Sequence, residues 1–294
     1  MISVKEIEAF YWTARLGTLQ NAALKLFVSQ SALSKRIQSL EQLTASPLFD
    51  RKGNRLTLTP HGETVYIKAQ RVLASLDGLL AMQAPANKLD RTLRIGVTEL
   101  TALTWFGSFA STLRKTYPML KLHPEVDVSS TLKEKLLAGS LDIAFIQDFY
   151  VDSSLTSIKI QSVQYGWFAS PGTFPEGRQV ALPEIACLPL IEQTAGSGLT
   201  ELTRAQFTSL GIETKHVFGS NSLAALGGLV EAGVGIACLP VRYFEPARRK
   251  KKISQLRTKP KAPTASYHAV FFPDDYATLG MSIAQIAAEC ASAW

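Results

Sequence analysis

One face of a predicted helix, within FVSQSALSKRIQSLEQ at residues 27–42, carries only slim polar side chains and one lysine. These side chains are Gln30, Ser31, Ser34, Lys35 and Gln38. A helix that only had to stay in solution would normally carry long charged pairs four residues apart. Glutamine, serine and lysine instead offer hydrogen-bond donors and acceptors that match base edges in the major groove of DNA. The face therefore predicts contact with a partner.

The elements around this face have the pattern of a helix-turn-helix. Leu33, Ile37 and Leu40 fall on the opposite side of the helix. Ser29 is placed to cap the start of the helix, and we expect it to contact DNA together with the polar face. The preceding segment LQNAALKLF, capped by Thr18, forms a second helix joined to the first by a short turn. Two helices in this arrangement are typical of DNA-binding proteins. The alternative is an ordinary amphipathic helix with a solvated face, and the capping, the turn and the basic surroundings disfavour it.

The chemistry of each polar residue predicts a contact. Gln30 matches an adenine edge, Ser34 matches several bases, and Lys35 matches a guanine or a phosphate. The next stretch, PLFDRKGNRLTLTPHG at residues 47–62, has a Gly-Asn turn followed by alternating LTLT, which predicts a β-hairpin wing. Basic residues on this wing would reach phosphates or the minor groove. They are Arg51, Lys52 and Arg55.

Charge supports an anionic partner for the first part of the chain. The 294-residue chain has a formal charge of +7 and a pI of about 9.3. Residues 1–62 hold eight Lys or Arg against four acids, so this segment is basic. A second basic run, RRKKK at 248–252, could add phosphate contacts, although such a run after a helix is usually a solvated face.

The helix after Pro60 has a dimerisation pattern. Its apolar residues are spaced by four and three, which forms an a/d seam, and an isolated helix with such a seam usually pairs with a copy of itself. Two copies would hold two reading heads at a fixed distance and match a two-fold DNA site, an interrupted palindrome. The seam consists of Val65, Ala69, Val72, Leu76 and Leu79.

The stretch VSQSALSKRIQSLEQ, followed by PLFDRKGNRLTLTPHG, resembles the winged helix-turn-helix of LysR-type transcriptional regulators. The resemblance implies that Gln30, Ser31 and Ser34 read bases and that Lys35 and Arg51 hold phosphates. The sequence departs from the family pattern, which often has proline at Ser31, arginine at Lys35 and a wing arginine near Asn54. Because lysine cannot reproduce a bidentate arginine contact, Arg55 is expected to share the phosphate contacts.

The remainder of the chain alternates short apolar strands with helices, in the order LRIGV, a helix at 100–117, KLHPEVDV, TLKEKLLAG and LDIAFI. The pattern recurs from CLPLIE to GIACLP and is typical of a parallel sheet covered by helices. Further family markers are RIGV, TYP, AGSLDIAF and LVEAGVGIACLP, so the resemblance covers nearly the whole chain. It implies two α/β lobes crossed by two strands, as in periplasmic binding proteins, with YHAVFFP and the last helix returning to the first lobe.

This gives a predicted domain organisation. We expect a winged helix-turn-helix at 1–62, a linker helix for dimerisation at 63–85, a hinge at 86–92 and an effector-binding α/β domain at 93–294, with lobe I at about 93–162 and 267–294 and lobe II at about 163–266.

Polar residues follow the carboxyl ends of the predicted strands or begin the predicted helices. Ligands of open α/β folds bind there, close to helix N-termini, although such residues also cap helices for local reasons. As a group they predict an effector-binding cleft. They are Thr98, Glu99, Leu100, Thr101, Ser129, Ser130, Gln147, Asp148, Thr194, Ser197, Ser220, Asn221 and Ser222.

The effector itself is less constrained by the sequence. Exposed helix N-termini would suit an anion, and many relatives bind small carboxylates or aromatic acids. Glu99 and Leu100 argue against an acid, since a carboxylate would repel one unless it is neutralised or turned outward. Trp105 and Phe106 could wall an aromatic ligand or belong to the core. We expect an aromatic or amphipathic organic effector.

Other classes of protein fit less well. No signal peptide or membrane span is evident, because the longest apolar stretch, 223–241, contains Glu231, glycines and a proline, so we expect a cytoplasmic protein. Neither the four histidines nor the three cysteines have metal-ligand spacing, and the motif GVG at 233–235 lacks the context of a dinucleotide site. We predict neither metal nor cofactor.

Two functions from different classes remain. The first is a DNA-binding regulator that responds to a small organic effector; the resemblance implies a dimer of dimers, a homotetramer, with RNA polymerase as a further candidate partner. The second is a small-substrate enzyme whose N-terminal unit serves oligomerisation. Nucleophile, base and orienting group do not appear together as a motif, which favours the regulator. We therefore predict that the chain is not an enzyme.

Overall fold

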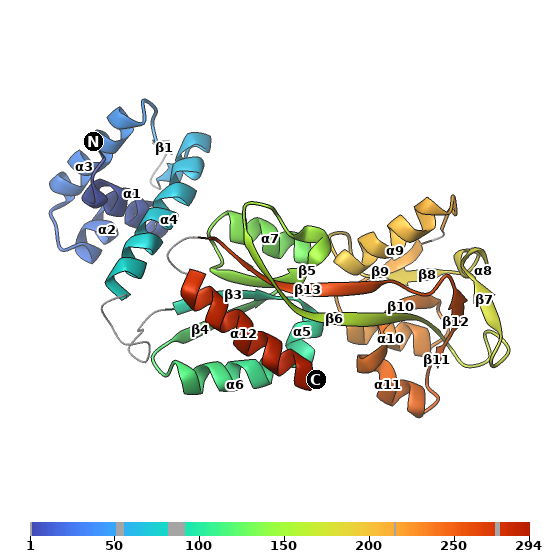
Figure 1. Cartoon of the computed structure of the whole chain (residues 1–294). Helices are drawn as coiled ribbons and strands as arrows, with labels where there is room; N and C mark the ends of the chain where they lie inside the picture. The colour runs from blue at the N-terminus through green and yellow to red at the C-terminus, as the bar shows by residue number, and fades with distance from the viewer. Residues whose placement is uncertain (1, 51–55, 82–91, 215, 274–276) are drawn as a thin grey trace. The chain divides into compact units, whose positions relative to one another are not determined.

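The computed structural model describes residues 2–50, 56–81, 92–214, 216–273 and 277–294. The chain divides into two units, unit 1 at Met1–Pro85 and unit 2 at Ala86–Trp294 (Figure 1). Buried side chains form one core in the first unit and separate clusters in the second. The predicted hinge at 86–92 lies outside the described residues except for Thr92.

Unit 1 is a helical unit with a short hairpin. Its described elements are α1 (Val4–Leu16), α2 (Leu19–Lys25), α3 (Gln30–Leu43), β1 (Phe49–Asp50), β2 (Thr57–Leu58) and α4 (Pro60–Ala81). The strands β1 and β2 pair antiparallel and form the base of the predicted wing, with Phe49 opposite Leu58. The wing residues Arg51, Lys52 and Arg55 lie outside the described residues.

Local sequence signals set the helix ends of unit 1. Ser3 and Glu6 form a capping box at the start of α1, and Gly17 ends this helix at a φ of 72°. The hydroxyls of Thr18 and Ser29 cap α2 and α3. Between these two helices Phe27 adopts a φ of 53°, and its side chain is exposed.

The core of unit 1 is built around the apolar face of α3. Leu33, Ile37 and Leu40 are buried against Ala9 and Phe10 of α1. The α4 helix joins this core through the buried Ala69, while Val65 and Tyr66 pack against it. The beginning of the a/d seam is therefore used within the unit, whereas Val72 is 41% exposed. The start of the seam is therefore part of the core of unit 1, and Val72, further along the helix, is not.

Unit 2 consists of two α/β lobes. Lobe I contains β3 (Thr92–Val97), α5 (Glu99–Leu103), α6 (Phe106–Thr116), β4 (Lys121–Val126), α7 (Ser129–Leu137), β5 (Ile143–Gln147), the 3₁₀ turn η2 (Asp148–Tyr150) and α12 (Ala277–Ala293). Lobe II contains β7 (Gln179–Ala181), α8 (Leu182–Ala186), β8 (Leu190–Glu192), α9 (Gly198–Ser209), β9 (His216–Gly219), α10 (Leu223–Glu231), β10 (Ile236–Pro240), α11 (Val241–Arg249), β11 (Ser254–Gln255) and β12 (Arg257–Lys259). The strands β6 (Thr156–Ala169) and β13 (Thr264–Phe271) connect the lobes.

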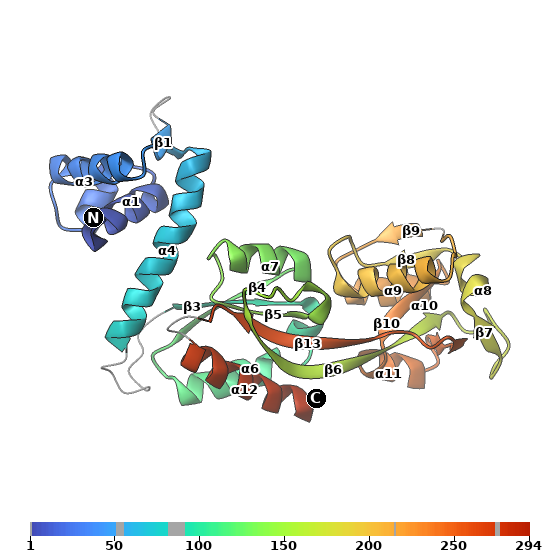
Figure 2. The same cartoon turned by 45° about the horizontal axis from the view of Figure 1, so that its top comes forward.

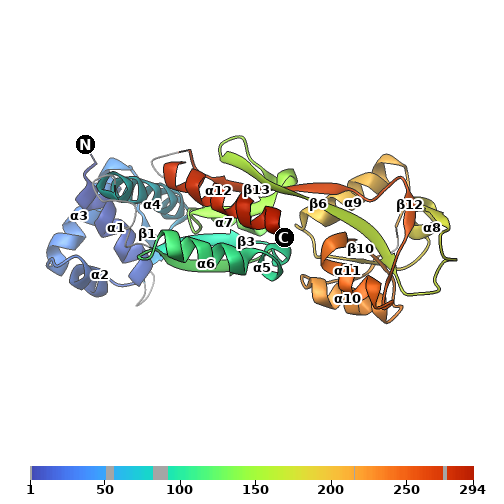
Figure 3. The same cartoon turned by 60° about the horizontal axis from the view of Figure 1, so that its bottom comes forward.

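One nine-stranded sheet runs through both lobes in the order β4-β3-β5-β13-β6-β10-β8-β9, with β11 added beside β6. The central strands β3, β4 and β5 of lobe I are parallel, as are β8, β9 and β10 of lobe II. The crossing strands β6 and β13 are antiparallel to each other. Figure 2 and Figure 3 show them running side by side from one lobe to the other.

Helices cover the sheet of lobe I on both sides, with α6 and α12 on one face and α7 on the other (Figure 1 and Figure 3). The last strand and helix of the chain thus return to lobe I, as predicted. A winged helix-turn-helix followed by a linker helix and a two-lobed α/β domain is the predicted fold class, and the structure confirms it.

The helix expected at 100–117 is two helices, α5 and α6. Thr104 breaks it, with a φ of −113° and a ψ of −90°. The Thr104 hydroxyl donates to the carbonyl oxygen of Leu100 at 2.6 Å, and side-chain bonds of this kind compete with the helical ladder. The break also turns Trp105 into the core of lobe I.

The packing of α3 predicts unequal effects of two leucine truncations in unit 1. Leu33 is fully buried and Leu24 is 69% exposed. We expect Leu33→Ala to lower the local free energy of opening by about 2–5 kcal/mol, because it leaves a cavity, and Leu24→Ala to change it by less than about 0.5 kcal/mol. Hydrogen-exchange mass spectrometry of α1 and α3 peptides in the full chain measures both. Equal effects of the two variants would contradict the packing described for α3.

Candidate functional site

The polar face of α3 is open to solvent. Gln30, Ser31, Lys35 and Gln38 are exposed and Ser34 is half-buried. The opposite face of the helix is held by the buried core of unit 1. The structure therefore places all five polar residues predicted for DNA contact on one accessible face.

The start of α3 is fixed by two serines. The hydroxyl oxygen of Ser29 accepts from the backbone N–H of Ala32 at 3.2 Å and lies 3.1 Å from the Ser31 hydroxyl. This N-cap satisfies one of the free donors at the helix start. Ser29 thus has a structural role, which sets the direction in which the first turn of α3 points.

A second contact ties α3 to α1. The Ser39 hydroxyl donates to Glu6 Oε1 at 2.5 Å, while Glu6 Oε2 accepts from the backbone N–H of Ser3 at 2.7 Å. The Ser39 hydroxyl and the Ser3 N–H stabilise the charged carboxylate and lower the pKa of Glu6. The carboxylate therefore links the capped end of α1 to the middle of α3 on its half-buried side.

The second candidate site is a cavity of about 460 Å³ between the lobes of unit 2. Eight of the thirteen residues predicted for effector contact line it. They are Thr98, Glu99, Leu100, Ser129, Gln147, Ser197, Asn221 and Ser222.

The other five predicted residues have local or supporting contacts and do not line the cavity. Thr101 is buried behind Thr98, and Asp148 is exposed and accepts from the N–H of its neighbour Phe149. In lobe II the Thr194 hydroxyl donates to Asn221 Oδ1, and the Ser220 hydroxyl caps the N–H of Ser222. Ser130 contacts the other lobe through its backbone.

Sequence reasoning missed the residues that the crossing strands and the loops contribute. Tyr165 of β6 and Tyr267 of β13 lie in the cavity wall, although neither follows the end of a parallel strand. The other missed lining residues are Val126, Asp127, Val128, Gln193, Gly198, Leu199 and Leu223. Asp127 and Gln193 do follow strand ends, and the same rule that selected Ser129 and Thr194 would have found them.

Gln147 and the two tyrosines form a buried hydrogen-bonded cluster. Gln147 Nε2 donates to the Tyr267 hydroxyl at 2.8 Å and to the Tyr165 hydroxyl at 3.2 Å, and these hydroxyls lie 3.0 Å apart. Burial raises the pKa of both tyrosines, so both stay protonated at neutral pH. The cluster joins β5 to both crossing strands in the wall of the cavity.

Contacts of polar atoms join the two lobes at and beside the cavity. Glu99 Oε2 of lobe I accepts from the backbone N–H of Leu223, the first residue of α10, at 2.5 Å. The carbonyl oxygen of Gly196 accepts from the backbone N–H of Ser130 in α7 at 3.1 Å. Gln147 Oε1 packs against Gly198, the first residue of α9, where a β-carbon would overlap it. The two lobes are therefore in contact around the cavity.

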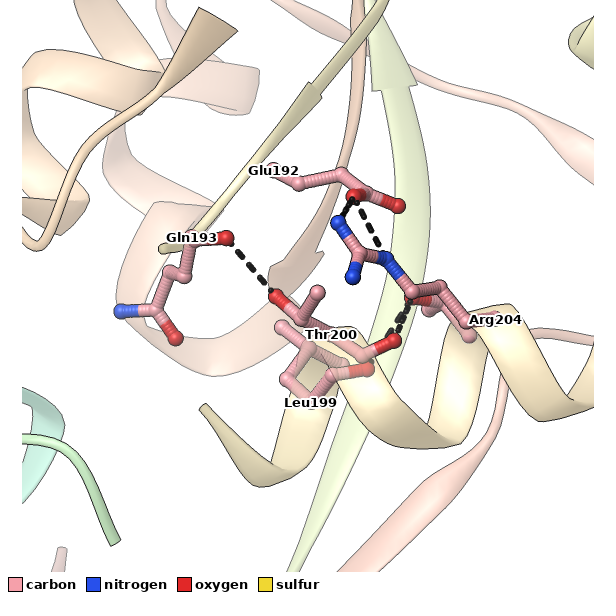
Figure 4. Close-up of polar contacts among 6 residues, drawn as sticks. Glu192, Gln193, Leu199, Thr200 and Arg204 are labelled. Carbon is pink, nitrogen blue, oxygen red and sulfur yellow. Dashed lines mark hydrogen bonds and ion pairs between the residues drawn. The ribbon is translucent and has the colours of Figure 1, made fainter. Parts of the chain in front are cut away.

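The α9 side of the cavity is fixed by polar contacts within lobe II (Figure 4). The Thr200 hydroxyl donates to the carbonyl oxygen of Gln193 at 3.1 Å, and Arg204 pairs with Glu192 at 3.0 Å. The Ser197 hydroxyl donates to Gln193 Oε1 at 2.5 Å. These bonds hold the start of α9 against the end of β8, so Gln193 and Ser197 face the cavity from a fixed position.

The ionisable groups in the described lining are two carboxylates, Glu99 and Asp127, apart from the two neutral tyrosines. Asp127 Oδ2 is paired with Lys135 Nζ at 3.2 Å, and the pKa of Lys135 is raised, chiefly by its hydrogen bond to Glu125. Glu99 pairs with no lysine or arginine among the described ion pairs. The lining therefore has an acidic character.

Two further features of the sequence, the aromatic pair Trp105 and Phe106 and the basic run at 248–252, do not line the cavity. Trp105 is buried against Phe109 and Phe145 and does not line the cavity, so of the two alternatives, aromatic wall or core, it belongs to the core. Phe106 packs against the same core. In the basic run at 248–252, Arg248 and Arg249 pair with Glu245, and Lys252 pairs with Glu231. These exposed pairs are typical of a solvated surface.

The three cysteines are free thiols. Cys238 is buried in β10, and burial raises its pKa, so its thiolate is disfavoured. Within the described residues, no group of three or more His, Cys, Asp or Glu side chains is arranged to hold a metal ion.

The described helices include none with the length and apolar character needed to span a membrane.

Comparisons with known proteins identify both units. Residues 4–63 match the family model of the bacterial regulatory helix-turn-helix protein, lysR family, and residues 86–282 match that of the LysR substrate binding domain. The HTH-type transcriptional regulator YofA of Bacillus velezensis is 26% identical over 243 residues, which cover 82% of each chain.

Solved structures share the fold across the full length. A full-length OxyR variant from Pseudomonas aeruginosa superposes with a TM-score of 0.76 at 20% identity, covering 99% of this chain and 94% of that one. LysG from Corynebacterium glutamicum, solved with bound effector Arg, gives a TM-score of 0.72 at 15% identity and covers 99% and 98%. The relatives named by sequence are transcriptional regulators and not enzymes. Both units match, in the order that the fold has them, and the chain belongs to the LysR family of transcriptional regulators.

Proposed function

We propose that this regulator reads double-stranded DNA with the exposed polar face of α3 and that a small organic effector binds in the cavity between lobes I and II. The accessible face of α3 carries the first part of the proposal, since its opposite side is fixed in the core. Gln30, Ser31 and Ser34 would contact base edges, and Lys35 a phosphate or a guanine. Gln38, one turn further on, would contact the DNA backbone, and Ser29 would act through its N-cap.

We propose that the basic residues of the predicted wing add further contacts to DNA. Arg51, Lys52 and Arg55 lie between β1 and β2 in sequence, in the stretch that the sequence predicts to be the tip of a hairpin wing. Arginine and lysine at such a tip suit phosphates or the minor groove.

We infer a dimer joined through α4. The exposed Val72 and the half-buried Leu76 continue the a/d seam beyond the part that packs within unit 1. A two-fold dimer would bind an interrupted palindrome, and pairs of dimers would form the homotetramer. Such a regulator would act in the cytoplasm, beside its promoter, with RNA polymerase as a further partner.

The lining of the cavity favours an amphipathic effector. Hydroxyl and amide groups of Thr98, Ser129 and Asn221 face it together with the side chains of Leu100 and Leu199. The aromatic wall comes from Tyr165 and Tyr267 of the crossing strands. Ligand sites of this size are typically apolar with a few placed polar groups. Because both lobes line the cavity, an effector would bias how they close.

The decisive experiment is selection of bound fragments from random DNA by the purified protein at low and at high salt. Enrichment of an interrupted palindrome, weaker at high salt, is the expected result. Absence of enrichment at both salt concentrations, with and without cell extract as a source of effector, would contradict DNA reading by α3.

Two single substitutions in α3 should change DNA binding in different ways, one its sequence preference and the other its overall affinity. We expect Gln30→Ala to change the preferred base pair at one position by about 1–3 kcal/mol, because it removes a base contact. Lys35→Ala should weaken all sequences alike and reduce the salt slope by about 1, because it removes a phosphate contact. Binding titrations on a set of single-base variants of the selected site measure both. A uniform loss of affinity for both variants would exclude direct readout by Gln30.

The dimer seam predicts a change in assembly. We expect Val72→Lys to weaken dimerisation by about tenfold or more, because it places a charge in an apolar helix interface. Thr64→Lys, which adds the same charge at an exposed position of α4, is the control. Sedimentation velocity over a range of protein concentrations measures the dimer fraction. The assignment of this seam would be wrong if both variants assemble like the wild type.

A further inference from the structure

Three helices of unit 2, α7, α9 and α10, begin beside the cavity with an oxygen of the other lobe against their first turn. Glu99 Oε2 accepts from the first N–H of α10, and the carbonyl oxygen of Gly196 accepts from the second N–H of α7, that of Ser130. Gln147 Oε1 packs on the first residue of α9. Helix N-termini are the groups that would otherwise bind the carboxylate of an acidic effector. In this chain its own oxygens occupy these positions.

This arrangement bears on the two alternatives left open by the sequence, that the helix N-termini suit an anion and that Glu99 disfavours an acid. The carboxylate of Glu99 is neither neutralised by a lysine or arginine in the described ion pairs nor turned away, because Glu99 lines the cavity while bonded to α10. An acidic effector would have to displace Glu99 from α10 or bind beside its charge. Binding beside the charge is unfavourable because like charges repel. Displacement exchanges one carboxylate on the α10 donor for another and leaves Glu99 without this hydrogen bond, so it gains little.

Two side-chain oxygens of the cavity lining accept no hydrogen bond from the described residues. Glu99 lines the cavity and is half-buried, and its Oε1 has no hydrogen bond within the described residues. Gln147 is buried at 3% exposure, and its Oε1 also lacks a partner among the described residues. The orientation of this amide follows from its surroundings, since Nε2 donates to two tyrosine hydroxyls and the oxygen then faces the positive end of α9.

We propose that the effector carries an ammonium group, which binds the Glu99 carboxylate within the cavity, and that Glu99 excludes acids from this site. This inference rests on the proposed effector role of the cavity. A positively charged donor would satisfy Glu99 Oε1 while Oε2 stays on α10, so one carboxylate would connect the ligand and lobe II. The tyrosines and leucines of the lining accommodate the apolar remainder of the molecule.

The test uses three probes that differ only in their polar group: phenethylamine, 2-phenylethanol and 3-phenylpropionate. Thermal unfolding of the full chain is measured with each probe at millimolar concentration. We expect phenethylamine to raise the Tm by about 5 °C at saturation, with a smaller rise for the alcohol and none for the acid. If the acid stabilises the wild type as much as the amine does, or if none of the probes shifts the Tm, the assignment is overturned.

Two variants separate the charge of Glu99 from its shape. Glu99→Gln keeps an oxygen for the N–H of Leu223 and removes the charge, so the rise with phenethylamine should disappear and 3-phenylpropionate should begin to stabilise. Asp148→Asn removes an exposed carboxylate just outside the lining and should behave like the wild type. An unchanged response of Glu99→Gln to the amine would overturn the role of Glu99, even if the wild type prefers amines.

The DNA selection described above distinguishes this inference from the proposed function. Loss of DNA enrichment with an intact amine response would contradict DNA reading and leave the ligand class standing. Enrichment of a palindrome with no response to the amine would contradict the ligand class alone.

Discussion

The pairing of β6 with strands of both lobes is the constraint on which the regulatory unit depends. Residues 156–164 of β6 pair with β13 in one part of the sheet, and residues 165–168 pair with β10 of lobe II. Both lobes are thereby built on one continuous strand. A change in the angle between the lobes must be taken up by β6 and β13, because these are the strands that cross. Tyr165 lies at the residue where β6 changes partner and belongs to the cavity wall.

The cross-lobe contacts follow from this arrangement. Because the two strands keep the lobes close on one side, residues at the facing helix starts can meet on the other. Gly196 and Gly198 permit the approach, since Gly196 has a φ of 90° and a side chain at either position would overlap Ser130 or Gln147. Hydrogen bonds join the lobes at these points, and Leu100 of lobe I adds an apolar contact because it is buried in the core cluster of lobe II. Interfaces of this kind suit a pair of lobes whose relative position responds to a ligand.

The elements that depend on local sequence could be predicted well. The face of α3 was predictable because capping, periodicity and turn chemistry act within a few residues. Eight cleft residues were predictable because the carboxyl ends of parallel strands meet at one edge of a sheet. The two tyrosines were missed because their strands are antiparallel and enter the cavity by their middle. The partner of Glu99 lies 124 residues away, and no local pattern indicates such a contact.

Likeness of fold does not carry over the chemistry of the relatives. The chain superposes on OxyR, yet at 20% identity this shows the fold alone. Its own Cys238 is buried in a strand of the lobe II core, where burial raises the pKa and disfavours the thiolate. The same reasoning applies to the effector. The fold places the N-termini of α7, α9 and α10 beside the cavity. The residues that contact these N-termini decide which ligands can bind. In this chain Glu99 and Gln147 are those residues, so the ligand class must be argued from them and not from the fold.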